Sequence, residues 1–471
     1  MTHRKVVAGT LALLFAATAS MQVAAVDVGF STKYTRQCKP LGISEAEFKK
    51  LPKRPVVGPR ENVYKRVVRA QELLGEEKFQ EALDILLPLE ERVRGNKGDY
   101  VTVLQVLAIA YSQMEKFDKA IEYFKKAVEL KVLPYRIEQQ ILAQLASLYM
   151  IQGNIQKAAE YIERYFKHAV KPNWRHYELL AGAYGRLDKL DKAVCPMYLA
   201  VVSWHEEQAK IKAAIAKAKA EGKEPPKVKP EKAPKSSWYA FLSAAHMQLK
   251  DYQGAAQIYK AALHYFPTEK KYWTGLSAAY ALLKQTSNTF AVLSLMHRMD
   301  LMNKSGEYRN LGQHYSMLNA PYYAARTMEE GLRKGTIEAK PKHWSATASN
   351  WQLAQELRKA AAAYEKGAEL DDNGKLYARA AGVYAILEDW PKVVSRAKKA
   401  LEKGGLKNNE LARVYMNIGR AYTNMEKYDQ AIAYFKKAAT IPKYGKSASG
   451  WIGYVESMKQ TKEMLAQYEN L

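Results

Sequence analysis

Apolar and polar residues follow one another along most of this chain with the period of paired amphipathic helices. The clearest unit begins near Ala412. It has large residues at positions 4, 7, 11 and 24 of a 34-residue frame and small residues at positions 8, 20 and 27. In chain order these are Tyr415, Ile418, Gly419, Tyr422, Ala431, Phe435 and Ala438. The large residues would interlock two antiparallel helices, and the small ones would let those helices approach closely. The pattern therefore predicts a helical hairpin that ends near Pro442.

The same frame recurs between residues 61 and 441. Position 11 is held in turn by Leu73, Tyr111, Tyr149, Tyr184, His246, Tyr280, Tyr315, Trp351, Tyr384 and Tyr422. Successive copies follow at nearly regular intervals, and only the step from Tyr184 to His246 is much longer. We expect these aromatic positions, His246 included, to belong to the core. A repeat of this period predicts an all-α solenoid in which each hairpin covers the apolar face of the next.

These residues resemble the tetratricopeptide repeat (TPR) family, and the resemblance covers residues 61–441. It implies a right-handed α-solenoid of about ten helix pairs. About four pairs fall in residues 61–202 and about six in residues 236–445. Residues 446–471 are predicted to form a capping helix, because the last repeat of a solenoid needs its open core covered.

The one long gap corresponds to an insertion at residues 203–235. Its alanine- and lysine-rich first part, up to Ala220, predicts an extension of the preceding helix, and the Pro/Lys-rich part up to Lys235 predicts a semi-rigid or disordered return. Residues 210–235 contain nine lysines and three glutamates. Two interpretations remain open: a solvated tether, or an arm that docks on an acidic protein, an anionic polymer or an anionic lipid surface.

The first 25 residues have the pattern of a cleaved signal peptide. Basic residues 3–5 precede the apolar run 6–17, and a small-residue sequence ends at Ala25. We expect cleavage near Ala25, an irregular N-terminal segment over residues 26–60, and export to the periplasm of a Gram-negative bacterium. An uncleaved membrane anchor is the alternative. Nothing later in the chain is apolar over the length of a spanning helix, so we expect no transmembrane span in the mature chain.

Charge and cysteine content narrow the classes of partner. The chain has 73 Lys and Arg against 48 Asp and Glu, a formal net charge of +25, which favours acidic partners. Export would remove nucleic acid from the candidates. Cys38 and Cys195 are the only cysteines. In an oxidising compartment they could form a disulfide that ties the N-terminal segment to the fourth repeat, or Cys195 could be a small core residue.

The sequence contains no recognisable catalytic motif. There is no Gly-rich phosphate loop, no GxSxG sequence, and no Cys/His spacing typical of a metal site. We therefore expect no enzymatic activity, no catalytic residues, no cofactor and no metal.

The candidate site follows from the resemblance. In the family, positions 2, 5, 6, 9 and 12 of the first helix of each repeat line the concave groove. Here these positions include Arg175, Lys271, Arg309, Asn310, Gln313, Lys342, Lys375, Arg379, Arg413, Asn417 and Arg420, and Glu178 is the only acid among them. Lys375 and Arg379 match two residues with which some family members clamp a terminal carboxylate, although Ala346 stands where that clamp has asparagine. We expect the C-terminal groove to bind an extended acidic or carboxylate-bearing segment; the alternative is that these side chains only keep the surface soluble.

Three functional interpretations are consistent with these features. The first is a non-catalytic periplasmic adaptor for protein partners. Its leader, repeat number and basic charge resemble the organisation of TPR proteins associated with TonB–ExbB–ExbD-type energy-transduction systems, which implies contact with TonB- or ExbD-like proteins. The second is a scaffold that guides an anionic polysaccharide during its handling or export. The third is a structural envelope protein or a chaperone for exported clients.

Overall fold

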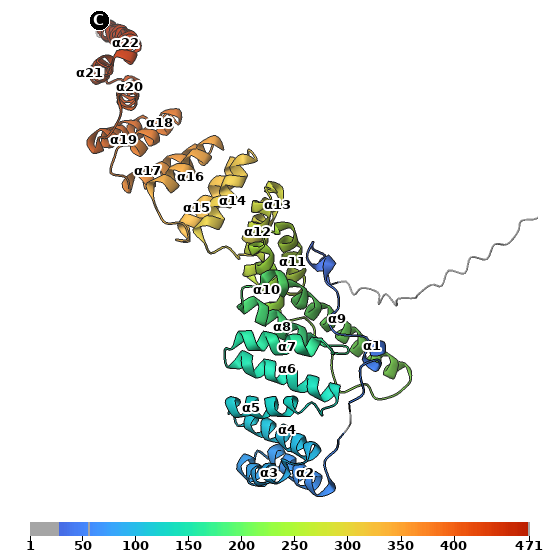
Figure 1. Ribbon diagram of the computed structural model, residues 1–471. Helices are drawn as coiled ribbons and strands as arrows, with labels where there is room; N and C mark the ends of the chain where they lie inside the picture. Colours follow the sequence, from blue (N-terminus) through green and yellow to red (C-terminus); the bar gives the residue numbers. More distant parts are fainter. Residues whose placement is uncertain (1–27, 55–56, 470–471) are drawn as a thin grey trace, which may run out of the picture. The chain divides into compact units, whose positions relative to one another are not determined.

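The computed structural model describes residues 28–54 and 57–469 (Figure 1). The expected leader at residues 1–25 lies outside them. From Glu61 to Ala439 the chain forms ten successive pairs of helices, each with a helix A and a helix B. The A helices are α2 (Glu61–Gly75), α4 (Lys97–Gln113), α6 (Tyr135–Ile151), α8 (Trp174–Arg186), α10 (Ser236–Gln248), α12 (Lys270–Leu282), α14 (Ser305–Met317), α16 (Pro341–Leu353), α18 (Lys375–Ile386) and α20 (Asn408–Asn424). The B helices are α3 (Phe79–Val93), α5 (Phe117–Glu129), α7 (Ile155–Phe166), α9 (Leu190–Ala220), α11 (Tyr252–Tyr265), α13 (Thr286–Arg298), α15 (Pro321–Arg333), α17 (Leu357–Glu369), α19 (Trp390–Lys403) and α21 (Tyr428–Ala439). The predicted all-α solenoid of ten helix pairs is confirmed.

One turn geometry joins helix A to helix B in the nine pairs that lie within a single unit. The residue at position 15 has a left-handed backbone, as in Glu77 (φ 61°), Gly153 (φ 77°) and Glu426 (φ 57°). The next N–H then bonds back to the carbonyl of position 11, for example from Lys427 to Tyr422 at 2.8 Å. This is the bond pattern of a Schellman turn, which ends helix A and reverses the chain.

The interior of a pair follows the predicted pattern of large and small residues. In the last pair Phe435 is fully buried, and its ring lies where a side chain on Gly419 would be; a Cβ there would approach the ring to 2.6 Å. His246, at position 11 of α10, is also fully buried. The position-11 aromatics Tyr184, Tyr280 and Tyr315 are half-buried.

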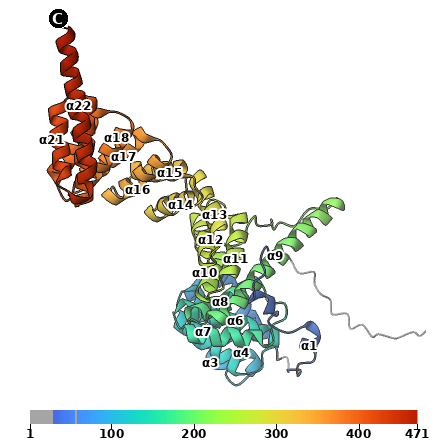
Figure 2. The same ribbon diagram turned by 90° about the horizontal axis from the view of Figure 1, so that it is seen from above.

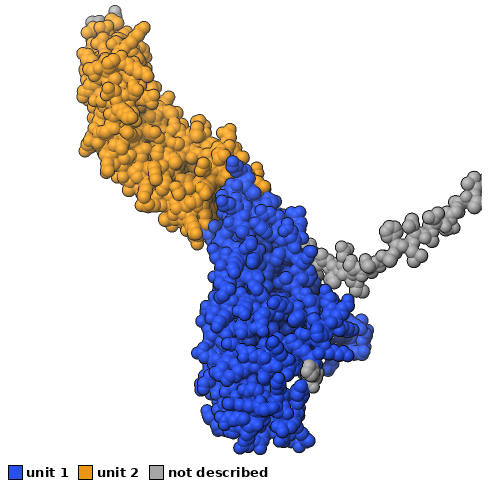
Figure 3. Space-filling model, in the orientation of Figure 1, with its two compact units in different colours: residues 1–284 blue, residues 285–471 orange. Residues whose placement is uncertain are grey.

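The array consists of two compact units (Figure 3). Unit 1 ends at Lys284 and unit 2 begins at Gln285, so that α12 belongs to unit 1 and α13 to unit 2. The insertion 203–235, which separates the two predicted repeat blocks, lies inside unit 1.

The insertion begins as a continuation of α9. This helix is 31 residues long and runs well beyond its neighbours in unit 1 (Figure 2). The return segment is fastened to α9, because Trp204 Nε1 donates to Glu231 Oε2 at 2.9 Å and the Glu231 N–H donates to Gln208 Oε1 at 2.8 Å. At its end, Lys235 Nζ lies 2.8 Å from Glu178 Oε2 on α8.

The N-terminal segment is a strap bound along unit 1 (Figure 1). Residues 28–54, with the short helices η1 (Thr35–Gln37) and α1 (Glu45–Lys49), run against the order of the repeats. Phe30 packs edge-on against Tyr239 of α10 at 6.1 Å. Further along, the Ile43 N–H donates to the Ala169 carbonyl at 2.8 Å, ahead of α8, and Arg54 pairs with Glu138 on α6.

The strap is joined covalently to the fourth repeat. Cys38 and Cys195 form a disulfide with a Cα–Cα distance of 5.2 Å across 157 residues of sequence. The bridge therefore ties the strap to α9.

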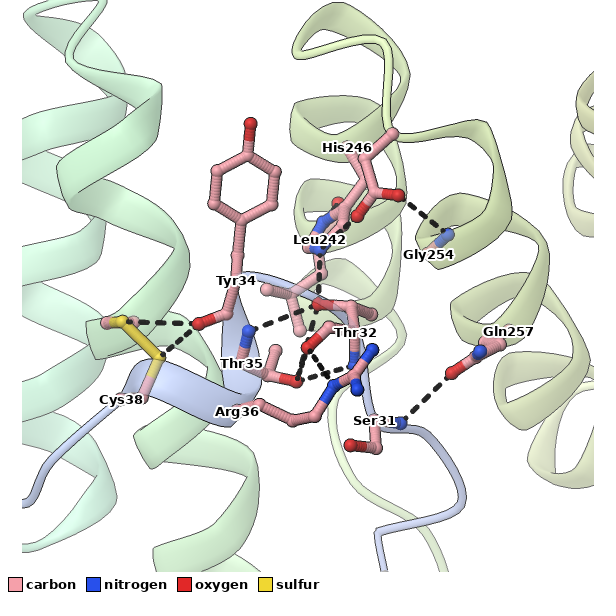
Figure 4. A network of polar contacts seen from close by, with 12 residues as sticks. Ser31, Thr32, Tyr34, Thr35, Arg36, Cys38, Leu242, His246, Gly254 and Gln257 are labelled. Atoms are coloured by element: carbon pink, nitrogen blue, oxygen red, sulfur yellow. Dashed lines mark hydrogen bonds and ion pairs between the residues drawn. A yellow bond between two sulfur atoms is a disulfide. The ribbon is translucent and has the colours of Figure 1, made fainter.

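A buried polar network holds the strap close to this bridge (Figure 4). His246 Nδ1 lies 2.8 Å from the Leu242 carbonyl oxygen, so this nitrogen carries the proton and Nε2 accepts from the Thr32 hydroxyl at 2.9 Å. Thr32 is 1% exposed. The Ser31 N–H donates to Gln257 Oε1 on α11 at 3.1 Å. Burial lowers the pKa of His246, which keeps the ring neutral and able to accept.

After η2 (Pro442–Tyr444), the chain ends in α22 (Gly445–Glu469), the predicted capping helix. Trp451 of α22 stacks on Phe435 of α21 with ring centroids 5.5 Å apart. Within the described ranges, no helix combines the length and the apolarity that crossing a bilayer requires.

Candidate binding groove

The groove positions expected from the repeat do line a hollow in unit 1. Its volume is about 790 Å³, and its walls come mainly from α4, α6 and α8 of the second to fourth repeats. Positions 2, 6 and 9 of α6, for example, supply Gln140, Gln144 and Ser147. Glutamine amides and apolar side chains make up most of this lining, and Arg175 and Arg186 add positive charge to its neutral hydrogen-bonding groups.

Of the charged side chains that line this hollow, Glu178 is paired within the protein, whereas Arg175 and Arg186 form no ion pair with a carboxylate among the described residues. Glu178 accepts from Trp238 Nε1 at 2.8 Å and pairs with Lys235. Lys271, at position 2 of α12, pairs with Glu269 at 2.6 Å. Burial, with a further contribution from the nearby positive charge of Arg175, lowers the pKa of His176 to about 4, so this ring is neutral at pH 7.

Unit 2 contains the nine groove residues singled out from the sequence. Arg309, Asn310 and Gln313 lie on α14, Lys342 on α16, Lys375 and Arg379 on α18, and Arg413, Asn417 and Arg420 on α20. All are exposed except Lys375 and Asn417, which are half-buried. Across residues 28–54 and 57–469, none of the six cations in this set forms an ion pair with a carboxylate. Their charge is therefore directed at solvent or at a ligand.

Three of these residues meet in one pocket. Arg413, Asn417 and Arg420 line a hollow of about 300 Å³ together with Tyr444, Ser447 and Trp451. Arg309, Lys342 and Lys375, on the three preceding A helices, do not line it. Arg379 instead reaches the preceding repeat, where its Nη1 donates to Ser345 Oγ at 3.3 Å.

Two features of the unit 2 groove were missed from the sequence. The first is a set of exposed apolar side chains at position 13 of successive A helices: Met317 (66% exposed), Leu353 (70%) and Ile386 (59%). The second is the contribution of α22 through Trp451. Extending the 34-residue frame past Pro442 would have found it, because the frame places Trp451 at position 6 of a further helix A.

The described residues contain no cluster of three or more His, Cys, Asp or Glu side chains arranged to hold a metal ion.

Two parts of the chain match models of known protein families. Residues 56–180 match the family described as the SusR N-terminal TPR domain, and residues 412–443 match the tetratricopeptide repeat family. No curated protein sequence matches the chain significantly.

Among solved structures, the chain is similar to a tetratricopeptide repeat protein from Parabacteroides merdae (15% identity, TM-score 0.30, covering 57% of this chain and 93% of that one). It is also similar to the C-terminal part of a TPR repeat-containing protein from Cytophaga hutchinsonii (12%, TM-score 0.34, 65% and 95%). A third is the TPR2AB domain of yeast Sti1 in complex with pHSP90 (15%, TM-score 0.28, 65% and 98%).

Proposed function

Since the chain is a tetratricopeptide repeat protein, a fold typical of non-enzymatic interaction scaffolds, we propose that it is a non-catalytic adaptor whose unit 2 groove binds an extended acidic segment of a protein partner. The observation that supports this proposal is the set of six groove cations without carboxylate partners among the described residues. Some cations elsewhere in the described residues are paired within the protein instead, as Lys334 is with Glu330 at 2.9 Å.

Many small contributions would provide the affinity. An exposed ion pair contributes about 0.2–1 kcal/mol, so six contacts along the groove would add up to a few kcal/mol. Met317, Leu353 and Ile386 would contribute burial of apolar surface beside these charges. Positive potential along the groove would also speed the capture of an acidic segment.

The test is a double charge reversal, Arg379→Glu with Arg413→Glu. We expect it to weaken the binding of a fluorescently labelled, glutamate-rich peptide on the order of 30-fold, because each reversal removes an attraction and adds a repulsion. The matched control is Arg326→Glu with Arg333→Glu, two exposed arginines on the B helix α15. It changes the net charge equally but leaves the groove intact. Equal binding by both double variants, with an unchanged helical circular dichroism signal, would contradict the proposal.

We propose further that the protein acts outside the inner membrane of a Gram-negative envelope. The leader pattern supports this proposal, as does the disulfide between the chain's two cysteines, because such bonds persist in oxidising compartments. A TonB–ExbB–ExbD-type complex is the partner system that the organisation of the sequence favours. Crosslinking in cells followed by mass spectrometry tests this, and recovery of TonB- or ExbD-like proteins is the expected result.

A second candidate is an anionic polysaccharide, which the lysine-rich insertion favours. Lys210, Lys212 and Lys219 on the projecting part of α9 have no carboxylate partner within the described residues. Reversing these three charges, Lys210→Glu with Lys212→Glu and Lys219→Glu, separates the two candidates. Capture of a protein partner should survive this change, whereas binding of a uronate polymer to the arm should be lost.

A further inference from the structure

The last helix, α22, takes the place of an eleventh helix A. When the repeat frame is continued into it, its buried Ala448 and Val455 occupy positions 3 and 10, and the same positions of α20 hold buried Val414 and Ala421. Its Glu456, at the position that is aromatic in most other repeats, is exposed. α22 therefore caps the array and also extends the groove by one helix.

Two parallel rows of side chains face the end of the groove. On α20 the row is Arg413, Asn417 and Arg420, and on α22 it is Ser447, Trp451 and Tyr454. Each row has the spacing i, i+4, i+7, which puts its members on one face of the helix. Each member of the second row stands one repeat length after its counterpart in the first. The repeat thus places a cationic and amide row beside a hydroxyl and aromatic row.

Both rows line real hollows. The α20 row, with Ser447 and Trp451, surrounds the pocket of about 300 Å³. Ser447, Trp451 and Tyr454 line a second hollow of about 380 Å³. Because Ser447 and Trp451 belong to both, the two hollows adjoin, and a ligand could touch the arginines and the aromatic rings at once.

The aromatic rings are held in place before any ligand arrives. Trp451 stacks on Phe435, with the two planes 16° apart, and Phe435 is fully buried. Tyr454 meets Trp451 edge-on at 5.7 Å and is itself 55% exposed. Rigid aromatic side chains lose little conformational entropy on binding and offer a large contact area, which makes them effective anchors.

From this arrangement we infer that the α20–α22 pocket accepts an aromatic side chain flanked by carboxylates in an extended peptide. The inference rests on the proposed function of the groove and names the feature that its far end recognises. Arg413 and Arg420 would each bind a carboxylate, and the aromatic side chain would pack on Trp451 and Tyr454. A uronate sugar is the competing ligand that the test has to exclude, because Asn417, Ser447 and the hydroxyls of Tyr444 and Tyr454 offer neutral polar groups to its hydroxyls.

Three labelled peptides test the inference on the full chain. The first contains glutamates around one phenylalanine, the second replaces that phenylalanine with serine, and the third keeps it but replaces the glutamates with glutamines. We expect the first to bind about tenfold more tightly than the second, because burying an aromatic side chain contributes more than about 1 kcal/mol. The third should bind least, because it lacks the charges.

Tyr454→Ser should remove the tenfold advantage of the phenylalanine peptide and leave the binding of the serine peptide unchanged. Tyr323→Ser, on the B helix α15 and 52% exposed, is the matched control and should preserve the advantage. Trp451→Leu serves as a second variant. Because it could loosen the cap, its helical signal has to be compared with that of the parent.

The outcomes separate this inference from the proposed function. Equal binding of the first two peptides by the parent, or an advantage that survives Tyr454→Ser, would overturn the inference while leaving the acidic groove in place. If neither acidic peptide bound, both would fail. Displacement of the phenylalanine peptide by tri-galacturonate, with sugar binding lost in Tyr454→Ser, would assign the pocket to a uronate sugar and also overturn the inference.

Discussion

In unit 1, the groove of the second to fourth repeats contains a single carboxylate, Glu178, and Lys235 and Trp238 both bind it. In unit 2, the same positions of the same repeat hold six cations with no carboxylate partner among the described residues. Unit 1 also has the strap and its disulfide to Cys195. The two grooves therefore differ in the amount of free positive charge: among the described residues, Arg175 and Arg186 are the unpaired cations that line the unit 1 hollow, beside the paired Glu178, whereas the unit 2 groove positions hold six.

The two units should differ most in stability when the disulfide that holds the strap is removed. We expect Cys38→Ser with Cys195→Ser to destabilise unit 1 by about 2–4 kcal/mol, because the bridge closes a long loop. Unit 2 should keep its stability. Pulse proteolysis in urea, with the cleavage sites mapped by mass spectrometry, measures both units in one sample. Reduction of the parent protein should reproduce the result, and cleavage confined to unit 2 would contradict it.

Salt should weaken the binding of an acidic peptide to the unit 2 groove. Raising the salt concentration from about 50 to about 500 mM should weaken the binding of a glutamate-rich peptide by about tenfold, because exposed charges are screened over a few ångströms at high ionic strength. Any binding that remains in the Arg379→Glu, Arg413→Glu variant should depend little on salt. Fluorescence anisotropy titrations at both salt concentrations test this, and a slope that is equal for parent and variant would show that the charges lie elsewhere.

Lowering the pH should destabilise unit 1 because of its buried histidines. Burial lowers the pKa of His176 to about 4 and lowers that of His246 as well. Both rings are neutral when folded, whereas in the unfolded chain they would take up protons near pH 6.5. The unfolded state therefore binds more protons between about pH 6.5 and 4, and the stability of unit 1 should fall as the pH is lowered through this window.

Thermal unfolding between pH 7 and pH 4.5 measures this loss of stability. The stability of the His246→Asn variant should depend less on pH than that of the parent protein. The control is His264→Asn, at an exposed histidine on α11, which should leave the pH dependence of stability unchanged. A parent protein equally stable across the window would contradict the account of these side chains.

The smallest effect should come from making the unit 1 groove resemble that of unit 2. Glu178→Gln removes its only carboxylate and releases Lys235. We expect the glutamate-rich peptide to gain a weak second site, with an affinity increase at this groove of about threefold at most, in line with the value of one exposed charge. Isothermal titration calorimetry would detect the change in stoichiometry. Glu160→Gln, at an exposed position of α7, should cause none.

The sequence predicted the helix pairs because their determinants are local and periodic. Gly419 under Phe435 and the recurring position 11 are visible within a single 34-residue copy. The strap could not be predicted in the same way. Thr32 bonds to His246 across 214 residues and Ser31 bonds to Gln257 across 226, and no short pattern encodes such pairs.

The repeat frame correctly predicted that the groove residues lie on the A helices. It could not predict which of their charged side chains form ion pairs. Both Lys271 and Arg379 stood out as groove cations, yet only the structure shows that Glu269 neutralises the former. The same 34-residue frame, continued past Pro442, also predicts Trp451 and Tyr454 as groove residues. They were missed because the last predicted repeat ends near Pro442. Charge pairing depends on side-chain positions from separate elements, and for this reason the repeat frame could not show that Lys271 is paired with a carboxylate while, among the described residues, Arg379 is not.

Hydrogen–deuterium exchange of the full chain, with and without a glutamate-rich peptide, tests the central claim most directly. We predict that the peptide slows exchange in the A helices of unit 2, in α16, α18 and α20 above all, and leaves α4, α6 and α8 unchanged. Protection confined to α4, α6 and α8, or protection of α16 to α20 that persists in the Arg379→Glu, Arg413→Glu variant, would contradict the claim that the unpaired cations of unit 2 form the binding surface.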